Sequence, residues 1–297
     1  MKNILFFKLR VLFLSFNFCY SQNQINLDVD NDLYFDSRDM YYSSGIFVSF
    51  SSLENTDDKI FFNHFKIGQL IYTPSSRYEI NPNLYDYPYS GYLFLELSKQ
   101  KQISENSSFT FGGNIGITGD ASLAKGMQNL YHDLVLDLPH LAWNSQMPQE
   151  FQINLVANYF KGFKIEDNVN ITTKLYSKIG TYQIMTGVNF GLLIGDINWT
   201  GFSDNLINNS KNKLSFYLGT HQEYYFHDYK LEGSLFNEDA PLTMTSNKYR
   251  NTIEVGLKKK FRNLQILTTF NSMSKDTEKQ RTSRHPFLKI SLSYQLN

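Results

Sequence analysis

The sequence predicts an all-β protein, a transmembrane antiparallel β-barrel of about 12 strands with a long, partly helical outer loop. Twelve segments alternate apolar with other residues, the pattern of strands that have two different faces. Aromatic residues make up 16% of the chain, with 20 Tyr and 25 Phe, as expected for a wall with aromatic girdles. Connections between the segments alternate between short and long, which fits a barrel with turns at one end and loops at the other.

The first 21 residues are expected to be a signal peptide. Basic residues at Lys2, Lys8 and Arg10 precede an apolar run over 11–18, and the small residue Ser21 suits the cleavage position. The predicted domains are therefore a signal peptide, 1–21, and a barrel domain, 22–297.

The single cysteine of the chain, Cys19, lies in this segment. Phe18 before it argues against lipoprotein processing, which needs a small residue at that place. A mature chain without a thiol forms no disulfide. Removing the segment's three basic residues leaves 25 basic against 28 acidic residues, a formal charge of −3 with no basic stripe, so nucleic acid is not an expected partner. Beyond the segment no apolar run approaches the roughly 20 residues of a membrane helix.

The strands follow in chain order from their alternation. The first six segments are 24–35, 43–52, 59–72, 91–101, 107–118 and 150–160. The other six are 168–178, 181–194, 213–226, 249–261, 264–274 and 287–297. The clearest alternating sets are Phe151, Ile153, Leu155, Ala157 and Tyr159 in the sixth segment, and Leu288, Ile290, Leu292, Tyr294 and Leu296 in the last. An even count that ends on a strand fits closure of a single-chain barrel.

The connections support a barrel over a secreted β-sandwich, which would also alternate. Short polar turns are expected at 54–59, 102–106 and 162–167. Long loops are expected at 76–90, 119–149, 228–247 and 275–285. The connection 196–212 breaks the pattern, because it is long where the count requires a short turn.

The longest loop contains the first candidate catalytic group. Gln128 and His132 stand four residues apart, so a helix would place both on one face. A histidine in a loop is most often simply solvated. A neutral imidazole on the outer face could instead take a proton from water near neutral pH.

The first strand carries a run of carboxylates, Asp28, Asp30 and Asp32, on one expected face. Their spacing is like the start of a calcium hand loop, but that motif needs glycine at position 33 and glutamate at 39, where this chain has Leu33 and Asp39. Two readings remain open. The run either lines a polar lumen, or it builds a hard-cation site of Asn and Asp oxygens at the rim.

Nucleophilic serine chemistry has little support in the sequence. The chain has no G-x-S-x-G elbow, and none of its six histidines is followed two residues later by serine, as in outer-membrane phospholipase A. Zinc is not expected either, because the histidines lack ligand spacing.

Taken together, short motifs along nearly the whole mature chain resemble the outer-membrane lipid A 3'-O-deacylase family. DMYYSSG at 39–45 is similar to the family's D-x-Y-Y-T-N-G, and DYPYSGY at 86–92 is similar to its D-R-P-Y-A-G-W. The remaining pieces are DNDLYF at 30–35, Gly68-Gln69, YTP at 72–74, LEG at 231–233, and Gly119, Gln128, His132, Trp143, Gln146 and Glu150 in the central loop.

The resemblance implies a 12-stranded enzyme that removes the 3'-linked acyloxyacyl chain from lipid A in the outer leaflet, with calcium. It implies His132 as the general base, Gln128 and Ser43 as supporting catalytic residues, and Asn31 and Asp32 as the metal site. Water would attack directly, without an acyl-enzyme. We expect lipopolysaccharide as the partner, the cell outer membrane as the location and a monomer.

Four residues depart from the family pattern: Ser43 and Ser44 replace Thr and Asn, Tyr87 replaces Arg, and Tyr92 replaces Trp. Serine keeps the hydroxyl of threonine. Tyr87 lacks a charge that could meet a phosphate of the substrate. The alternatives are a non-enzymatic channel or binding barrel, which would have an open lumen, and a phospholipase-type barrel, which would need a serine beside a histidine.

Overall fold

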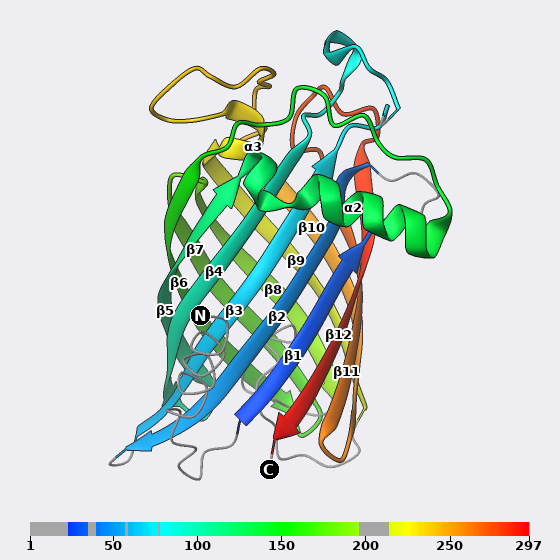
Figure 1. Cartoon of the computed structure of the whole chain (residues 1–297). Helices are drawn as coiled ribbons and strands as arrows, with labels where there is room; N and C mark the ends of the chain where they lie inside the picture. The colour runs from blue at the N-terminus through cyan, green and yellow to red at the C-terminus, as the bar shows by residue number, and fades with distance from the viewer. Residues whose placement is uncertain (1–22, 35–39, 57–58, 77, 196–213, 297) are drawn as a thin grey trace, which may run out of the picture.

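The twelve strands form one closed antiparallel barrel, in which each strand pairs with its neighbours in sequence and β1 pairs with β12 (Figure 1). The computed structural model describes residues 23–34, 40–56, 59–76, 78–195 and 214–296. Closure joins Asn23 to Leu296 at one end of the β1–β12 ladder and Asn31 to Leu288 at the other. The predicted fold class is confirmed, and the sandwich is excluded.

The strands agree with the predicted segments in order but are mostly longer. Their bounds are β1 (Asn23–Asn31), β2 (Tyr41–Thr56), β3 (Lys59–Thr73), β4 (Ser90–Ser104), β5 (Ser107–Thr118) and β6 (Phe151–Glu166), then β7 (Val169–Gly180), β8 (Gln183–Gly195), β9 (Leu214–Asp228), β10 (Tyr249–Phe261), β11 (Leu264–Ser274) and β12 (Arg284–Leu296). Strands β2 and β6 extend beyond their alternating segments because backbone pairing with their neighbours continues where the apolar pattern stops.

The barrel has two unlike ends. The turn end holds the described start of β1, the end of β12 and tight connections such as Ser104 to Ser107 and Phe261 to Leu264. The loop end holds the long connections with all the described helical turns (Figure 1). The expected signal peptide, 1–21, and the connection 196–212 lie outside the described residues.

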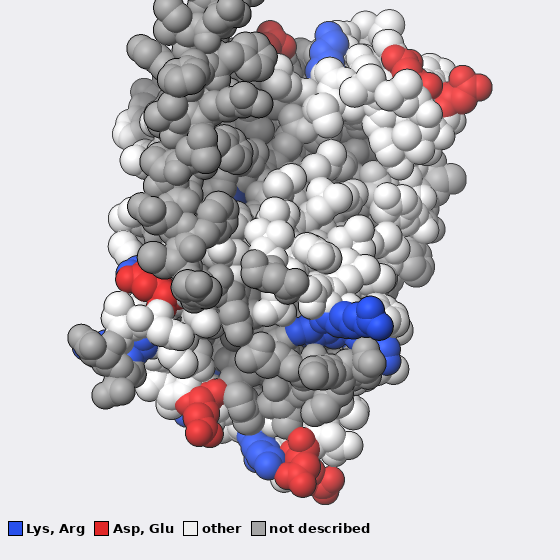
Figure 2. Space-filling model, turned by 60° about the horizontal axis from the view of Figure 1, so that its bottom comes forward, with Lys and Arg blue, Asp and Glu red and all other residues white. Residues whose placement is uncertain are grey.

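The outer surface of the wall is apolar. On β10, Ile253 and Leu257 face outward and are exposed, while the residues between them are more enclosed. Tyr249 at the loop end and Phe261 at the turn end are also exposed, as expected for aromatic girdles at both membrane interfaces. In Figure 2 most charged side chains lie near the ends of the molecule, and the described wall between them is largely uncharged.

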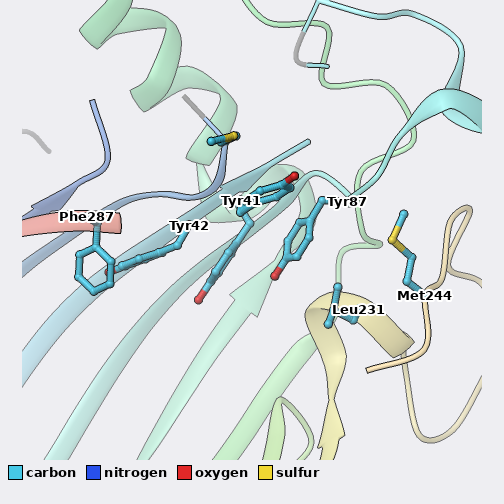
Figure 3. Close-up of a cluster of buried hydrophobic side chains, with 8 residues drawn as sticks. Tyr41, Tyr42, Tyr87, Leu231, Met244 and Phe287 are labelled. Atoms are coloured by element: carbon cyan, nitrogen blue, oxygen red, sulfur yellow. The ribbon is translucent and has the colours of Figure 1, made fainter. Parts of the chain in front are cut away.

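The lumen is filled at the loop end. One cluster of buried side chains combines Tyr41, Tyr42, Tyr72, Tyr87, Leu231, Met244 and Phe287 with Met40 (Figure 3). The Tyr42 and Phe287 rings meet edge to face with centroids 4.9 Å apart. A second cluster stacks Tyr92 on Tyr182 with centroids 3.9 Å apart.

A buried charge network lies beside these rings. Arg250 contacts Asp228 at 2.7 Å and Asp276 at 3.2 Å, and Lys230 contacts both carboxylates as well. Lys230 belongs to the short helix α3 (Tyr229–Glu232) and Asp276 to the last loop, so the network joins loops that are far apart in sequence.

The central loop is partly helical, as predicted. It consists of the 3-10 turn η2 (Gly119–Ser122), helix α2 (Ala124–Tyr131) and the π-turn η3 (His132–Leu136). A second 3-10 turn, η1 (Pro82–Leu84), lies in the preceding long loop. Helix α2 runs across the strands at the loop end and contacts β3 and β4 (Figure 1). Among the described residues, no helix is long and apolar enough to cross a membrane.

Candidate functional site on the outer side of the barrel wall

Alternation along β1 decides on which side of the wall each candidate lies. Ile25 and Leu27 are exposed on the outer face, and Asn31 has the same parity, so it lies on the outer side too. Asp28 and Asp30 face the lumen. The first accepts a hydrogen bond from Ser291 and the second accepts one from the hydroxyl of Tyr42, at 2.7 Å. The reading of a polar lumen is therefore correct for these two carboxylates.

Asp32 lies just beyond β1, which ends at Asn31, so it is not part of a strand face. The expectation that Asp28, Asp30 and Asp32 line one strand face is wrong for Asp32. Its backbone N–H donates to the Ser43 carbonyl at 3.3 Å, and its Oδ2 accepts from the Met40 N–H at 2.8 Å. Asp32 is fully buried at the start of the first loop, and its bond to Met40 joins it to the residue just before β2.

Asn31 begins the turn that carries the chain away from β1. Its side-chain Oδ1 accepts a hydrogen bond from the N–H of Leu33 at 2.8 Å. This Asx turn takes the chain out of the strand. Asn31 is buried although its strand face points outward, so the loop end covers it.

Ser43 occupies a β-bulge. Tyr42 pairs with Tyr72 and Ser44 pairs with Ile71, so Ser43 is the extra residue of β2. A bulge turns side chains away from the regular alternation. Ser43 thereby directs its hydroxyl outward to α2, while Tyr42 points into the lumen cluster.

Gln128 connects Ser43 to the central loop. Its Nε2 donates to the Ser43 Oγ at 3.2 Å, and its Oε1 accepts from the Trp143 Nε1 at 2.8 Å. The two bonds fix which end of the amide is the donor. Gln128 and His132 are both buried on the side of α2 that packs against the wall, so the predicted shared face is confirmed.

The ring of His132 is fully buried and its Nδ1 lies 2.9 Å from the Pro139 carbonyl oxygen. A carbonyl only accepts, so Nδ1 carries the proton and donates. The neutral ring then has its lone pair on Nε2. This partner could not be predicted from local spacing, because Pro139 reaches the ring only after η3 and the left-handed residue Asp137 reverse the chain.

Close packing holds α2 on the wall. A β-carbon at Gly91 of β4 would lie 2.2 Å from the Ser122 Oγ and 2.4 Å from the Ala124 side chain, so only glycine admits the helix at this distance. Gln69 on β3 donates to the Ser122 carbonyl at 2.6 Å. Around this contact lies an apolar cluster on the outer side of the wall, formed by Ile71, Tyr85, Tyr89, Ala124, Leu141 and Trp143.

The residues expected at the metal site offer oxygen donors only. In the described part of the chain no group of three or more His, Cys, Asp or Glu side chains could hold a metal ion. Asn31 and Asp32 supply an amide oxygen and a carboxylate, and the backbone beside them supplies carbonyls. This donor set suits calcium, which takes neutral oxygens and water beside carboxylates, and does not suit zinc. The family position Asp39 lies outside the described residues.

One serine–histidine pair was missed by the sequence motifs. Ser51 on β2 and His64 on β3 are cross-strand partners, with Oγ and Nδ1 2.9 Å apart. Ser51 stands four residues after Phe47 on the same strand, so both side chains lie on the same face of β2. Phe47 packs against the buried cluster of Tyr92 and Tyr182 in the lumen, so the pair faces the lumen and not the lipid.

Two of the residues that depart from the family pattern, Tyr87 and Tyr92, have buried side chains. Tyr87 is fully buried and its hydroxyl donates to the Asp276 Oδ2 at 2.7 Å. It faces the charge network, and the effect of this position on phosphate recognition stays a prediction. Tyr92 faces the lumen, where its hydroxyl donates to Asn114 at 2.8 Å.

Comparison with known proteins decides the family. The family model described as outer membrane protein LpxR matches residues 5–296. The chain belongs to the LpxR family of outer membrane proteins. The resemblance drawn from the motifs is thus confirmed, and so is an outer-membrane location.

Solved structures support the fold of this family member. LpxR from Salmonella typhimurium matches with a TM-score of 0.76 and 18% identity over 91% of this chain and 99% of that chain. The beta domain of the Bordetella autotransporter BrkA matches with a TM-score of 0.50 and 7% identity over 92% of this chain and 98% of that one. A search of curated proteins finds no match.

Proposed function

We propose that the protein is an outer-membrane carboxylic-ester hydrolase, a lipid A deacylase that removes the 3'-linked acyloxyacyl chain of lipopolysaccharide. The observation that carries the proposal is the hydrogen-bonded group of Ser43, Gln128 and Trp143, with His132 one helical turn further on, on the outer side of the wall. A site there meets the acyl chains of a lipid, which the lumen does not.

His132 is the proposed general base. With Nδ1–H held by the Pro139 carbonyl, Nε2 takes a proton from water as the water oxygen bonds to the ester carbonyl carbon. The bond from that carbon to the sugar oxygen then breaks, and the proton passes to the leaving alkoxide. The products are the free acyloxyacyl acid and a lipid A hydroxyl.

Ser43 and Gln128 position the ester. The Gln128 amide donates to the Ser43 Oγ, and this bond holds the Ser43 hydroxyl beside α2 on the outer side of the wall. A donor that is fixed before the reaction stabilises developing negative charge without reorganisation.

Asn31 and Asp32 are the proposed calcium ligands, through the amide Oδ1 and the carboxylate. When bound, calcium would supply Lewis-acid polarisation of the ester carbonyl. The Asx turn at Asn31 and the Met40 N–H on Asp32 orient these oxygens in advance.

The proposed orientation puts the loop end outside the cell, so that α2 lies level with the outer leaflet. The signal peptide expected at 1–21 and the short connections at the opposite end of the barrel agree with it. We propose that the protein acts as a monomer, because the candidate residues come from one chain. The filled loop end of the lumen weighs against a channel.

Mass spectrometry of lipid A from cells that express the protein tests the proposal. Cells with the wild-type chain should produce lipid A lighter by one 3'-acyloxyacyl group, and cells with an inactive His132 variant should not. Unchanged lipid A with a folded wild-type barrel would contradict the proposed substrate. Loss of acyl chains from glycerophospholipids instead would identify a phospholipase.

A further inference from the structure

Helix α2 has an exposed apolar side that the proposed chemistry does not use. Leu123, Met127, Leu130 and Leu134 follow each other at intervals of four, three and four residues. Met127 and Leu130 lie on α2, Leu123 is the residue that precedes it, and Leu134 lies in η3, which continues it. Projected along these helical turns, the four residues form one stripe. All four are exposed, with Leu130 at 50% and Leu134 at 75% of their surface.

The helix has three sides with different surroundings. Ala124, Gln128 and His132 are buried against the barrel wall. Lys125 and Asp133 are exposed on a second side, turned well away from the apolar stripe. The stripe forms the third side. A helix that touches protein, water and a third, apolar medium suits a membrane interface.

The position of α2 indicates which medium covers the stripe. The helix packs on β3 and β4, whose outer faces carry exposed Ile67 and Leu95. Those faces are part of the lipid-facing wall, so the stripe borders a surface that acyl chains already cover. Three of the four residues are leucines, and the fourth, Met127, is a flexible thioether. They include none of the Arg, Tyr or Trp side chains that anchor protein interfaces.

We propose that this stripe inserts into the acyl-chain layer of the membrane leaflet at the loop end. The lipid contact then holds α2 at a fixed depth, with its buried side on the wall. The inference goes beyond the proposed hydrolysis and does not depend on it, because any activity of the protein leaves the stripe exposed in the same way.

Spin-label depth measurements test the proposal on the full chain. Single cysteines are placed at Met127, Leu130 and Leu134 of the stripe, each in a Cys19→Ser background and labelled with a nitroxide. The matched control is Lys125→Cys on the other exposed side of the same helix. Each protein is reconstituted in phosphatidylcholine vesicles, and heat-modifiable migration on gels confirms that the barrel is folded.

The measurement compares two collision rates of each nitroxide label. One is the rate with oxygen, which concentrates in the acyl layer, and the other is the rate with a water-soluble nickel chelate. The stripe positions should favour oxygen several-fold over the chelate, and position 125 should favour the chelate. Equal or greater access of the chelate at the stripe would overturn the proposal. So would protection from both reagents, because it would indicate a protein partner or a second copy on this side.

Discussion

Single hydrogen bonds determine the chemistry available at the candidate site. The Pro139 carbonyl selects the tautomer of His132, and the Trp143 indole selects the orientation of the Gln128 amide. Both partners lie in the irregular part of the central loop. A side chain in that loop can therefore change the site without touching the substrate.

Substitution of His132 tests the proposed base. His132→Ala should reduce ester hydrolysis by about 10²–10⁴-fold, the usual contribution of a general base. His132→Asn is the sharper variant, because its amide can still donate near the Nδ1 position to the Pro139 carbonyl but offers no base. Rates of lipid A deacylation in detergent measure both.

The control for these variants is His140→Ala. His140 pairs with Asp133 at 2.8 Å on the exposed side of the loop, so its loss should leave the rate nearly unchanged. Full activity of His132→Asn would remove His132 from the proposed mechanism and make His140 the next candidate.

Chelation tests the proposed calcium site. If Asn31 and Asp32 hold the ion, excess chelator and Asp32→Ala should cause the same loss of activity. Adding chelator to the Asp32→Ala variant should cause no further loss, because both treatments remove the same bound ion. Calcium, but not magnesium, should restore the chelated wild type, since magnesium demands a stricter octahedron. Asp30→Ala is the control, because Asp30 faces the lumen and Tyr42. Undiminished activity in chelator would remove the cofactor from the proposal.

At the scale of elements, the site depends on how closely α2 approaches β4. Gly91 sets that distance, since a β-carbon there would meet the Ser122 and Ala124 side chains. The bulge at Ser43 supplies the other contact, between β2 and the helix. The helix is short, so these contacts hold it more than its own propensity does.

A pair of alanine substitutions tests the importance of this contact. Gly91→Ala should push α2 from the wall, and a displacement of about 1 Å can lower a rate about 10²-fold. Gly126→Ala, on the same helix, adds a β-carbon that meets nothing within 4 Å and should stabilise the helix by about 1 kcal/mol without loss of rate. Activity and the rate of proteolysis at α2 measure both variants. Equal activity of the two would show that helix position does not control the reaction.

On the scale of the whole molecule, an apolar wall encloses a lumen that is filled at one end by rings and charges. The Asp228, Lys230, Arg250 and Asp276 network ties the last two long loops to β9 and β10. Removing one member would leave buried charges uncompensated, which typically costs about 3–5 kcal/mol. This network, together with the aromatic clusters, fixes the loop end.

Acid should loosen the loop end before the wall. Burial alone would raise the pKa of Asp276, but Arg250 and Lys230 outweigh it and lower the pKa. Burial also opposes ionisation of Glu232, yet hydrogen bonds from His227 and Lys248 lower its pKa from 4.5 to about 2. Both carboxylates therefore stabilise the fold fully above about pH 4.5. The contribution of Glu232 is lost as the pH falls towards about 2, and that of Asp276 is lost as the pH falls through its lowered pKa.

Two signals recorded from pH 6 to pH 2 check this expectation. The near-ultraviolet signal of the packed tyrosines should decrease below about pH 4.5, while the far-ultraviolet β signal remains. Glu232→Gln should reduce the part of the change that depends on Glu232. A tyrosine signal that stays constant to pH 2 would contradict the assignment.

By itself the sequence determined the barrel class, the number and order of strands, the family and the pairing of Gln128 with His132 on one helix face. Alternation encodes directly which residues face lipid, and helical spacing encodes a shared face, so both can be predicted from neighbours in the chain. Only the tertiary structure decided the rest. Ser43 meets Gln128 across 85 residues of chain, and a bulge turns it outward. Asp32 lies outside the strand face of Asp28 because β1 ends one residue earlier, and Tyr87 donates to Asp276 across 189 residues of chain. These contacts depend on where distant segments meet, and no local pattern records that.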